Sequence, residues 1–255
     1  MISVVSLLVA TSLAFQADGL RADASPPSVS QSEIAQPQPE ITPELRGDVA
    51  MARKMYRDAV DYYKTGAATS AVLANKTGIA YQQLLELDYA RIYYQKAIKL
   101  NPSYVEAINN LGTIYFARKS YRRAIDLYKK ALRIRPASAT VLSNLGAAYF
   151  ATKKYADQLR VNAMALAIDP DIFERRSSQG VMVQDRTVEE RARYFYTMAK
   201  TYAKAGVAEH ALQYMRRALE EGFKDRQKFL EEPEFAFLKD NTEFQTILAT
   251  EYKAL

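Results

Sequence analysis

Side-chain amides are the groups in this chain whose type and spacing point most directly to a chemistry. Asn110 and Asn144 stand 34 residues apart, and Phe116 and Phe150 share this spacing. An Asn amide donates and accepts hydrogen bonds at once, so a row of amides can match the alternating N–H and C=O groups of an extended peptide. Exposed aromatic residues at corresponding positions often anchor a bound partner. These residues predict non-covalent binding.

Groups suited to catalysis are scarce. The chain of 255 residues has no Cys and a single His, which excludes thiol nucleophiles, Cys-rich zinc sites and multi-His metal sites. His210 has no Ser or Asp partner in a motif, so a surface or packing role is expected for it. The carboxylates of "EEPE" and "VEE" lack the defined separation that acid–base catalysis needs, and no Gly-rich phosphate loop occurs. We therefore predict a protein without catalytic residues, metal or cofactor.

A repeat of 34 residues fixes where the amides and aromatic rings fall. The residues that recur at this interval are Pro102, Pro136 and Pro170, Gly78, Gly112 and Gly146, and Tyr81, Tyr115 and Tyr149. Within each unit, apolar and small residues share one face of a first helix and one face of a second helix. Proline then ends the second helix, because it lacks the N–H donor and clashes with the preceding turn. Each unit is predicted to be a helix-turn-helix.

This pattern resembles the tetratricopeptide repeat, which places Leu, Gly, Tyr, Ala, an aromatic residue, Ala and Pro at fixed offsets within 34 residues. Residues 105–138 meet every position, and residues 71–104 meet those from Gly78 onward. Residues 139–172 carry Gln158 and Asn162 where Ala and an aromatic residue are usual, which predicts a less tightly packed second helix. The resemblance implies an all-α, right-handed superhelical solenoid whose first helices line a concave groove and whose second helices form a convex back.

The expected organisation has four parts. Residues 1–24 are predicted to be a signal peptide, 25–40 a Pro/Ser/Gln linker, 41–225 the repeat array and 226–255 a helical cap. Units are expected near 40–70, 71–104, 105–138, 139–172 and 192–225, with an insert at 173–191. After the array, Gly222 is predicted to end a helix and Thr242 to be the N-cap of a closing helix. This Gly-Phe tail is similar to the ends of other bacterial tetratricopeptide proteins.

The signal-peptide prediction rests on the first residues. The apolar run from Ile2 to Phe15 is shorter than the roughly 20 residues of a membrane-spanning helix. It is followed by Ala22-Asp23-Ala24, the small-x-small pattern of a cleavage site, although no Lys or Arg precedes the run. A periplasmic or extracellular location is expected, with an uncleaved anchor or an apolar tail as the alternatives.

The groove is predicted to bind an extended peptide or a helix of an envelope protein. The residues expected there are Asn75, Lys76, Asn109, Asn110, Phe116, Asn144, Phe150, Tyr196 and Lys200. Two alternatives stay open: the asparagines are repeat-consensus residues, and the phenylalanines pack against neighbouring helices. Family members that bind chaperone tails carry Lys and Arg where this chain has Thr140 and Asn144, so that partner is disfavoured.

Charge suggests a second surface. The formal net charge is +6, and the second helix of the unit at 105–138 is strongly basic. The residues expected on its convex side are Arg122, Arg123, Lys129, Lys130 and Arg133. They predict either peripheral contact with anionic lipid or polymer, as an assembly or surface-association factor, or an ordinary solvated helix face. Nucleic acid is not expected as a partner because of the predicted export.

Overall fold

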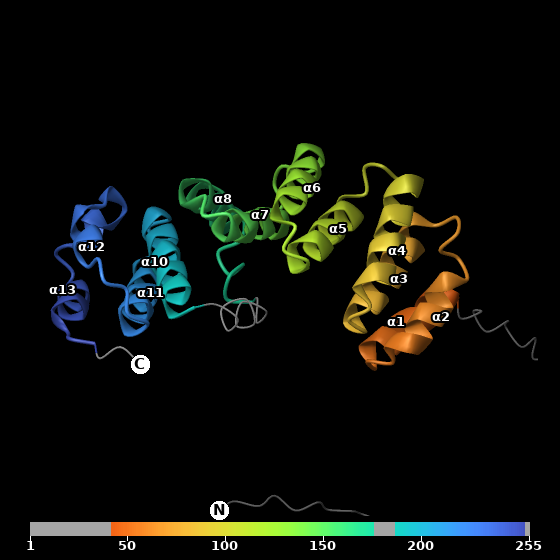
Figure 1. Cartoon of the computed structure of the whole chain (residues 1–255), viewed down its shortest axis with the longest axis horizontal. Coiled ribbons are helices and arrows are strands. Elements are labelled where there is room, and N and C mark those ends of the chain that lie inside the picture. Colours follow the sequence, from red (N-terminus) through yellow and green to blue (C-terminus); the bar gives the residue numbers. More distant parts are fainter. Residues whose placement is uncertain (1–41, 176–186, 253–255) are drawn as a thin grey trace, which may run out of the picture. The chain divides into compact units, whose positions relative to one another are not determined.

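The computed structural model describes residues 42–175 and 187–252, in which the regular structure is helical (Figure 1). The predicted signal peptide and linker, at residues 1–40, lie outside this part. The helices are α1 (Pro43–Ala52), α2 (Tyr56–Lys64), α3 (Ala71–Gln83), α4 (Leu87–Leu100), α5 (Val105–Ala117), α6 (Tyr121–Ile134), α7 (Ala139–Ala151), α8 (Tyr155–Ile168), α10 (Val188–Lys204), α11 (Ala208–Glu220), α12 (Gln227–Glu231), the 3-10 helix η1 (Pro233–Leu238) and α13 (Thr242–Ala249).

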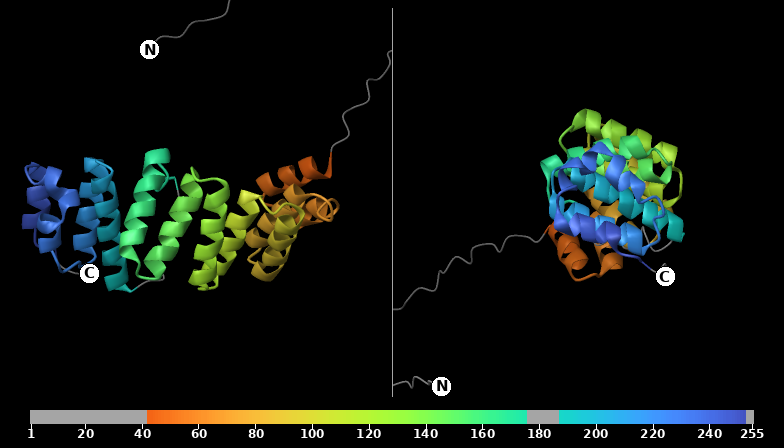
Figure 2. Two further views of the ribbon diagram at one scale, coloured as in Figure 1. Left: turned by 90° about the horizontal axis from the view of Figure 1, so that it is seen from above. Right: turned by 90° about the vertical axis from the view of Figure 1, so that its left-hand side faces the viewer.

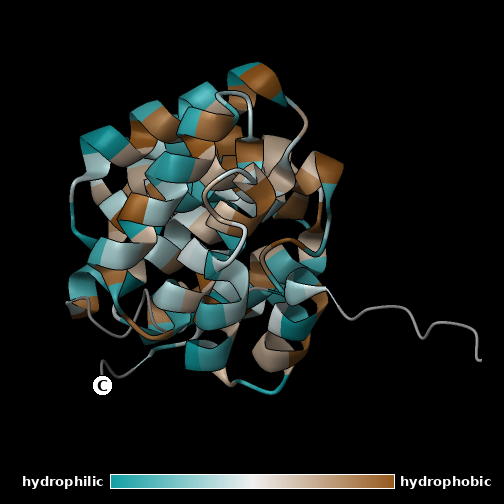
Figure 3. Cartoon of the chain, turned by 90° about the vertical axis from the view of Figure 1, so that its right-hand side faces the viewer, coloured by the Kyte–Doolittle hydropathy of each residue, from teal (hydrophilic) through white to brown (hydrophobic). Residues whose placement is uncertain are grey.

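Consecutive helices of the described part pack in pairs: α1 with α2, α3 with α4, α5 with α6, α7 with α8, and α10 with α11. Each second helix also packs against the first helix of the next pair, which places the pairs side by side (Figure 2). Figure 3 shows hydrophobic and hydrophilic residues on the same helices, and α6, for example, buries Ala124, Tyr128 and Ala131 on one face. The expected all-α solenoid of helix-turn-helix units is confirmed.

In the first four pairs a glycine in the first helix lets the second helix approach closely, whereas α10 contains no glycine. A Cβ atom on Gly112 would lie 2.6 Å from Cε1 of Tyr128, and one on Gly78 would lie 2.6 Å from Cε1 of Tyr94. Real Cβ atoms do not approach other atoms so closely, so only glycine fits under the ring. Tyr128 and Tyr94 are 1% and 0% exposed, and each ring fills the space between its paired helices. The glycines that mark the repeat in the sequence are thus packing residues.

The pair α7–α8 departs from this packing. Asn162 stands where the three preceding units have tyrosine, and it lies against Gly146. Asn162 and Gln158 are both buried, and their amides reach α10: Gln158 Nε2 donates to Thr197 Oγ1 at 3.2 Å, and Asn162 Nδ2 lies 3.8 Å from Met198 Sδ. Neither amide oxygen has a hydrogen-bond partner among the described residues. An unpaired buried polar group is unfavourable, so these contacts hold α8 to α10 less strongly than an aromatic ring would.

Two predicted boundaries differ from the structure. The helix α10 begins at Val188, inside the expected insert, because Thr187 and Glu190 form a reciprocal capping box. The closing helix α13 has Asn241 as its N-cap, since the Asn241 side chain accepts from the N–H groups of Glu243 and Phe244. Thr242, the predicted N-cap, is the first residue of that helix. Residues 176–186 of the insert lie outside the described part.

The turn between the two helices of each unit contains one residue in the left-handed backbone conformation. Lys54, Leu85, Lys119 and Lys153 have φ between 58° and 61°, and Gly206 has φ 76° in the last unit. This conformation is unfavourable for residues with a Cβ atom, and its recurrence shows that the packing of the paired helices imposes one turn geometry on different residue types.

We expect Gly112→Ala to lower the free energy of unfolding by about 2 kcal/mol, because the new methyl group overlaps the Tyr128 ring. Urea unfolding measures the change. The same substitution in a Tyr128→Ala background removes the overlap, so its effect there should fall below about 0.5 kcal/mol. Equal effects in both backgrounds would show that the ring is not the cause.

Candidate peptide-binding groove

A chain of side-chain amides crosses three successive first helices. Asn144 Nδ2 on α7 donates to Asn109 Oδ1 on α5 at 2.7 Å, Asn109 Nδ2 lies 3.4 Å from Asn110 Oδ1, and Asn110 Nδ2 donates to Asn75 Oδ1 on α3 at 3.1 Å. Asn75 is 4% exposed, whereas the other three asparagines are half-buried. The sequence analysis predicted that all four asparagines lie in the groove. The structure shows that Asn75, at one end of this row of amides, is buried.

The amides of Asn109 and Asn110 retain hydrogen-bonding capacity. An amide has two N–H donors and an oxygen with two lone pairs. The hydrogen bonds of the amide chain use one donor and one acceptor position on each of these two residues. Both side chains therefore hold neighbouring helices together and can also bind a partner from the half-exposed side.

Lys76, another predicted groove residue, is bound to α1. Its Nζ lies 2.8 Å from Glu44 Oε1 and 2.7 Å from Asp48 Oδ1, and the Tyr63 hydroxyl donates to the same Asp48 oxygen at 2.6 Å. Burial of Asp48 opposes its ionisation, but the hydrogen bonds from Lys76 and Tyr63 outweigh this and hold the pKa of Asp48 below its usual value. Lys76 thus fastens the first pair of helices to α3.

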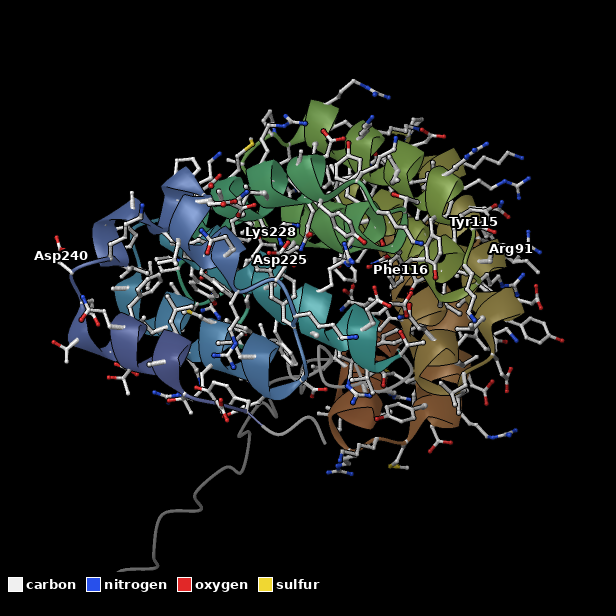
Figure 4. The ribbon with its side chains drawn as sticks, turned by 60° about the vertical axis from the view of Figure 1, so that its left-hand side comes forward. Arg91, Tyr115, Phe116, Asp225, Lys228 and Asp240 are labelled. Atoms are coloured by element: carbon white, nitrogen blue, oxygen red, sulfur yellow. The ribbon has the colours of Figure 1, made fainter. Side chains whose placement is uncertain are left out.

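The two predicted aromatic anchors lie in different surroundings. Phe116, labelled in Figure 4, is half-buried at the end of α5, with its ring centroid 5.3 Å from that of Tyr121. Phe150 is 4% exposed, and its ring packs against Tyr155 and Tyr194 at 5.6 and 5.4 Å. Phe150 is therefore a core residue, and the prediction that it is an exposed anchor is corrected. The alternative, packing against neighbouring helices, holds for it.

Tyr196 and Lys200 lie apart from the amides, beneath the C-terminal cap. The Tyr196 ring is 7% exposed and stacks on Phe223 at 4.3 Å. Lys200 Nζ lies 2.9 Å from Glu232 Oε2 and 3.4 Å from Glu234 Oε2. A pocket of about 1000 Å³ lies there, between α8, α10 and the residues 221–234. The cap thus encloses the face of α10 that was predicted to continue the groove.

The predicted basic residues form one exposed face of α6. Arg122, Arg123, Lys129 and Arg133 are exposed, and Lys130 is half-buried. The Arg123 guanidinium lies 5.5 Å from the centre of the Tyr115 ring, and Lys129 Nζ lies 5.9 Å from that of Tyr149. None of the five forms an ion pair with a carboxylate of the described residues. We call these five residues the α6 basic face.

The pocket at the cap is the feature that the sequence analysis did not find. Glu232 and Glu234 belong to the "EEPE" stretch, whose carboxylates were noted without a site. Pro233 between them begins η1, which directs both side chains toward α10. Elsewhere in the described residues, no three acidic or His side chains gather as a metal site would require, and no helix has the length and hydrophobicity to cross a membrane.

Comparisons with known proteins agree with this architecture. Models described as "TPR repeat" and "Tetratricopeptide repeat" match residues 112–153, 93–126 and 76–104. The chain therefore contains tetratricopeptide repeats. The fold of this chain is similar to that of a solved structure, "Crystal structure of MamA protein". The two have a TM-score of 0.50 and 19% sequence identity, and the match covers 72% of this chain and 92% of the solved chain.

Two curated relatives are "Uncharacterized protein ycf37" from Guillardia theta and from Pyropia yezoensis. The first is 30% identical over 92 residues, which are 32% of this chain and 50% of the relative. The second is 38% identical over 57 residues, which are 22% of this chain and 32% of the relative. The chain thus spans half the length or less of the relatives it matches.

We expect Lys76→Met to destabilise the chain at neutral pH by about 1 kcal/mol or less, as for a partly exposed ion pair. In the folded state the pKa of Asp48 lies below its usual value of 3.8. The contribution of the ionised Asp48 to the free energy of unfolding is therefore present above pH 3.8 and is lost as the pH falls through the lowered pKa. The difference between variant and wild type should therefore shrink in acid. Urea unfolding at about pH 7 and pH 3 measures it. Lys99→Met serves as the control at an exposed position. An equal difference at both pH values would contradict the assigned role of the Lys76–Asp48 ion pair.

Proposed function

We propose that the chain is a non-catalytic scaffold that binds a segment of a partner protein along α3, α5 and α7. The observation that carries this proposal is the amide chain from Asn144 to Asn75, which joins three successive first helices. Tetratricopeptide proteins act as scaffolds for protein–protein interaction, and the repeats of this chain support the same general role.

The chemistry of this face favours main-chain recognition. Its half-exposed side chains include Asn109, Asn110 and Asn144, with Phe116 at the end of α5. Lys76, a cation beside them, already pairs with the carboxylates of Glu44 and Asp48. Amides with one aromatic ring suit the peptide groups and an apolar side chain of an extended segment. Export of the chain, and so an envelope partner, forms part of the proposal.

Replacement of Asn110 by Ala tests the proposal most sharply, because a matched control exists. Asn75→Ala removes the same inter-helix hydrogen bond but replaces a buried residue that a partner does not reach. We expect Asn110→Ala to weaken partner binding at least about tenfold and Phe116→Ala to weaken it by about 2 kcal/mol. The Asn75→Ala variant should bind the partner with an affinity close to that of the wild type. The partner is first captured from an envelope fraction by the full chain and is then titrated against each variant.

The two asparagine variants decide between recognition and architecture. If Asn75→Ala and Asn110→Ala weaken binding equally, the amide chain acts only by holding the helices together. If neither variant changes the dissociation constant, the partner binds elsewhere. Thermal unfolding of each variant shows whether lost binding follows from lost structure.

The α6 basic face supports a second candidate function, attachment to an anionic surface. Its residues have no carboxylate partner in the described part of the chain, so their charge is available to lipid or polymer. Such contacts are screened by salt, whereas apolar and hydrogen-bonded contacts on the first helices persist.

We expect Arg122→Ser/Arg133→Ser to reduce co-sedimentation with vesicles of phosphatidylglycerol and phosphatidylcholine if this second function holds. Each basic residue near an anionic surface contributes about 1 kcal/mol, so loss of two should weaken binding by about 2 kcal/mol, or roughly thirtyfold. About 0.5 M NaCl should abolish sedimentation of the wild type. Equal sedimentation of variant and wild type, or none with either, would leave α6 as a solvated helix face. The matched control is Arg46→Ser/Arg53→Ser, which replaces two exposed arginines at α1.

A further inference from the structure

The pocket beneath the C-terminal cap has an apolar wall and a charged floor. Its wall includes Tyr155, Leu159, Val188, Ala192, Tyr196 and Phe223. At its floor, Lys200 from α10 meets Glu232 and Glu234 from the cap. A volume of about 1000 Å³ is ample for one or two amino-acid side chains.

The floor carries more negative than positive charge. Lys200 is the one cation within 4 Å of either carboxylate in the described residues, and it compensates one of the two charges. Glu232 and Glu234 side chains are 24% and 15% exposed, and the Oε2 atom of each is buried and in contact with Lys200 Nζ. Two carboxylates that share one ammonium group keep a net negative charge, which a second cation would compensate.

The Tyr196 hydroxyl adds to the unmet hydrogen-bonding capacity. It is buried in a residue 7% exposed, lines the same pocket and interacts with the Glu232 carboxylate, although not in ordinary hydrogen-bond geometry. Burial raises the pKa of Tyr196, and the interaction with Glu232 and the charges of Glu234 and Asp225 raise it further, so the hydroxyl stays protonated. Its oxygen can therefore accept a hydrogen bond from a bound donor.

The rim of the pocket carries ion pairs and two further lysines. Lys228 lies 3.4 Å from Asp225, and both are labelled in Figure 4. Arg193 pairs with Glu189 at 3.3 Å. Lys204 and Lys224 also line the pocket, but both are exposed, where solvent and salt screen their charge. The net negative charge at the floor has low solvent exposure, which strengthens its attraction for a cation.

We propose that this pocket binds a basic side chain, Arg or Lys, of a partner polypeptide. The charged end meets Glu234 and Glu232, and the aliphatic stem lies against Leu159, Val188 and the aromatic rings of the wall. The arrangement suits a guanidinium best, because it stacks on aromatic faces and donates several hydrogen bonds in one plane. The site is separate from Asn109 and Asn110, and the inference does not depend on the function proposed for them.

The test titrates the full chain with acetyl-Leu-Arg-Leu-amide and with its citrulline counterpart, which has the same shape without the charge. We expect the arginine peptide to bind at least about tenfold more tightly. Glu234→Gln should abolish this preference, whereas Glu243→Gln, which alters an exposed pair with Arg216 on another side of the cap, should keep it. Calorimetry or chemical-shift titration measures both affinities.

Thermal unfolding separates binding from a purely structural role. If Glu234 serves as a ligand group, Glu234→Gln removes an uncompensated charge and leaves the melting temperature equal or higher. A lower melting temperature with an unchanged arginine preference would show that Glu234 only fastens the cap to α10. Absence of binding by either peptide, or equal affinities for both, would also overturn the proposal. Asn110→Ala should keep the arginine preference, so failure at one site is distinguishable from failure at the other.

Discussion

The contact between a glycine on the first helix and a tyrosine on its partner, in the first three pairs, determines the spacing on which the other features of the array depend. Gly78 with Tyr94 and Gly112 with Tyr128 bring the paired helices so close that no Cβ atom fits between them. The resulting separation repeats from pair to pair. Successive first helices then stand near enough for side-chain amides to meet, as Asn110 and Asn75 do. The amide chain is thus a consequence of backbone spacing that the glycines permit.

The fourth pair shows what happens when this contact changes. Asn162 replaces the tyrosine, and the interface with α10 is completed by polar contacts to Thr197 and Met198. Directly beyond it, α10 and the C-terminal cap enclose a pocket in place of an open continuation of the groove. The departure from the repeat and the appearance of a distinct site therefore coincide. Regular units provide a uniform face of amides, and the irregular end provides the concentrated charge of Lys200, Glu232 and Glu234.

The C-terminal cap has two physical roles. Phe229, Phe235 and Phe244 are 0–1% exposed, and they cover the apolar end that a repeat array would otherwise present to water. The same segment carries Glu232 and Glu234 to Lys200, which a further repeat unit would have no reason to do. Because the carboxylates are fixed by η1 and by the buried aromatic residues around them, they are positioned before any ligand arrives. Such preorganisation reduces the entropy lost on binding.

The sequence by itself determined the helix pairs, their order and the role of glycine, because a period of 34 residues records contacts that recur between neighbouring units. It also identified α6 as a strongly basic helix. It did not show that Phe150 is buried, since Phe116 and Phe150 occupy the same position in their units and differ only in what packs beside them. It did not join "EEPE" to Lys200, because that contact crosses more than 30 residues outside the repeat and has no periodic signal. Contacts within the repeat can be read from spacing, whereas burial at the irregular end and the site formed there depended on the tertiary structure.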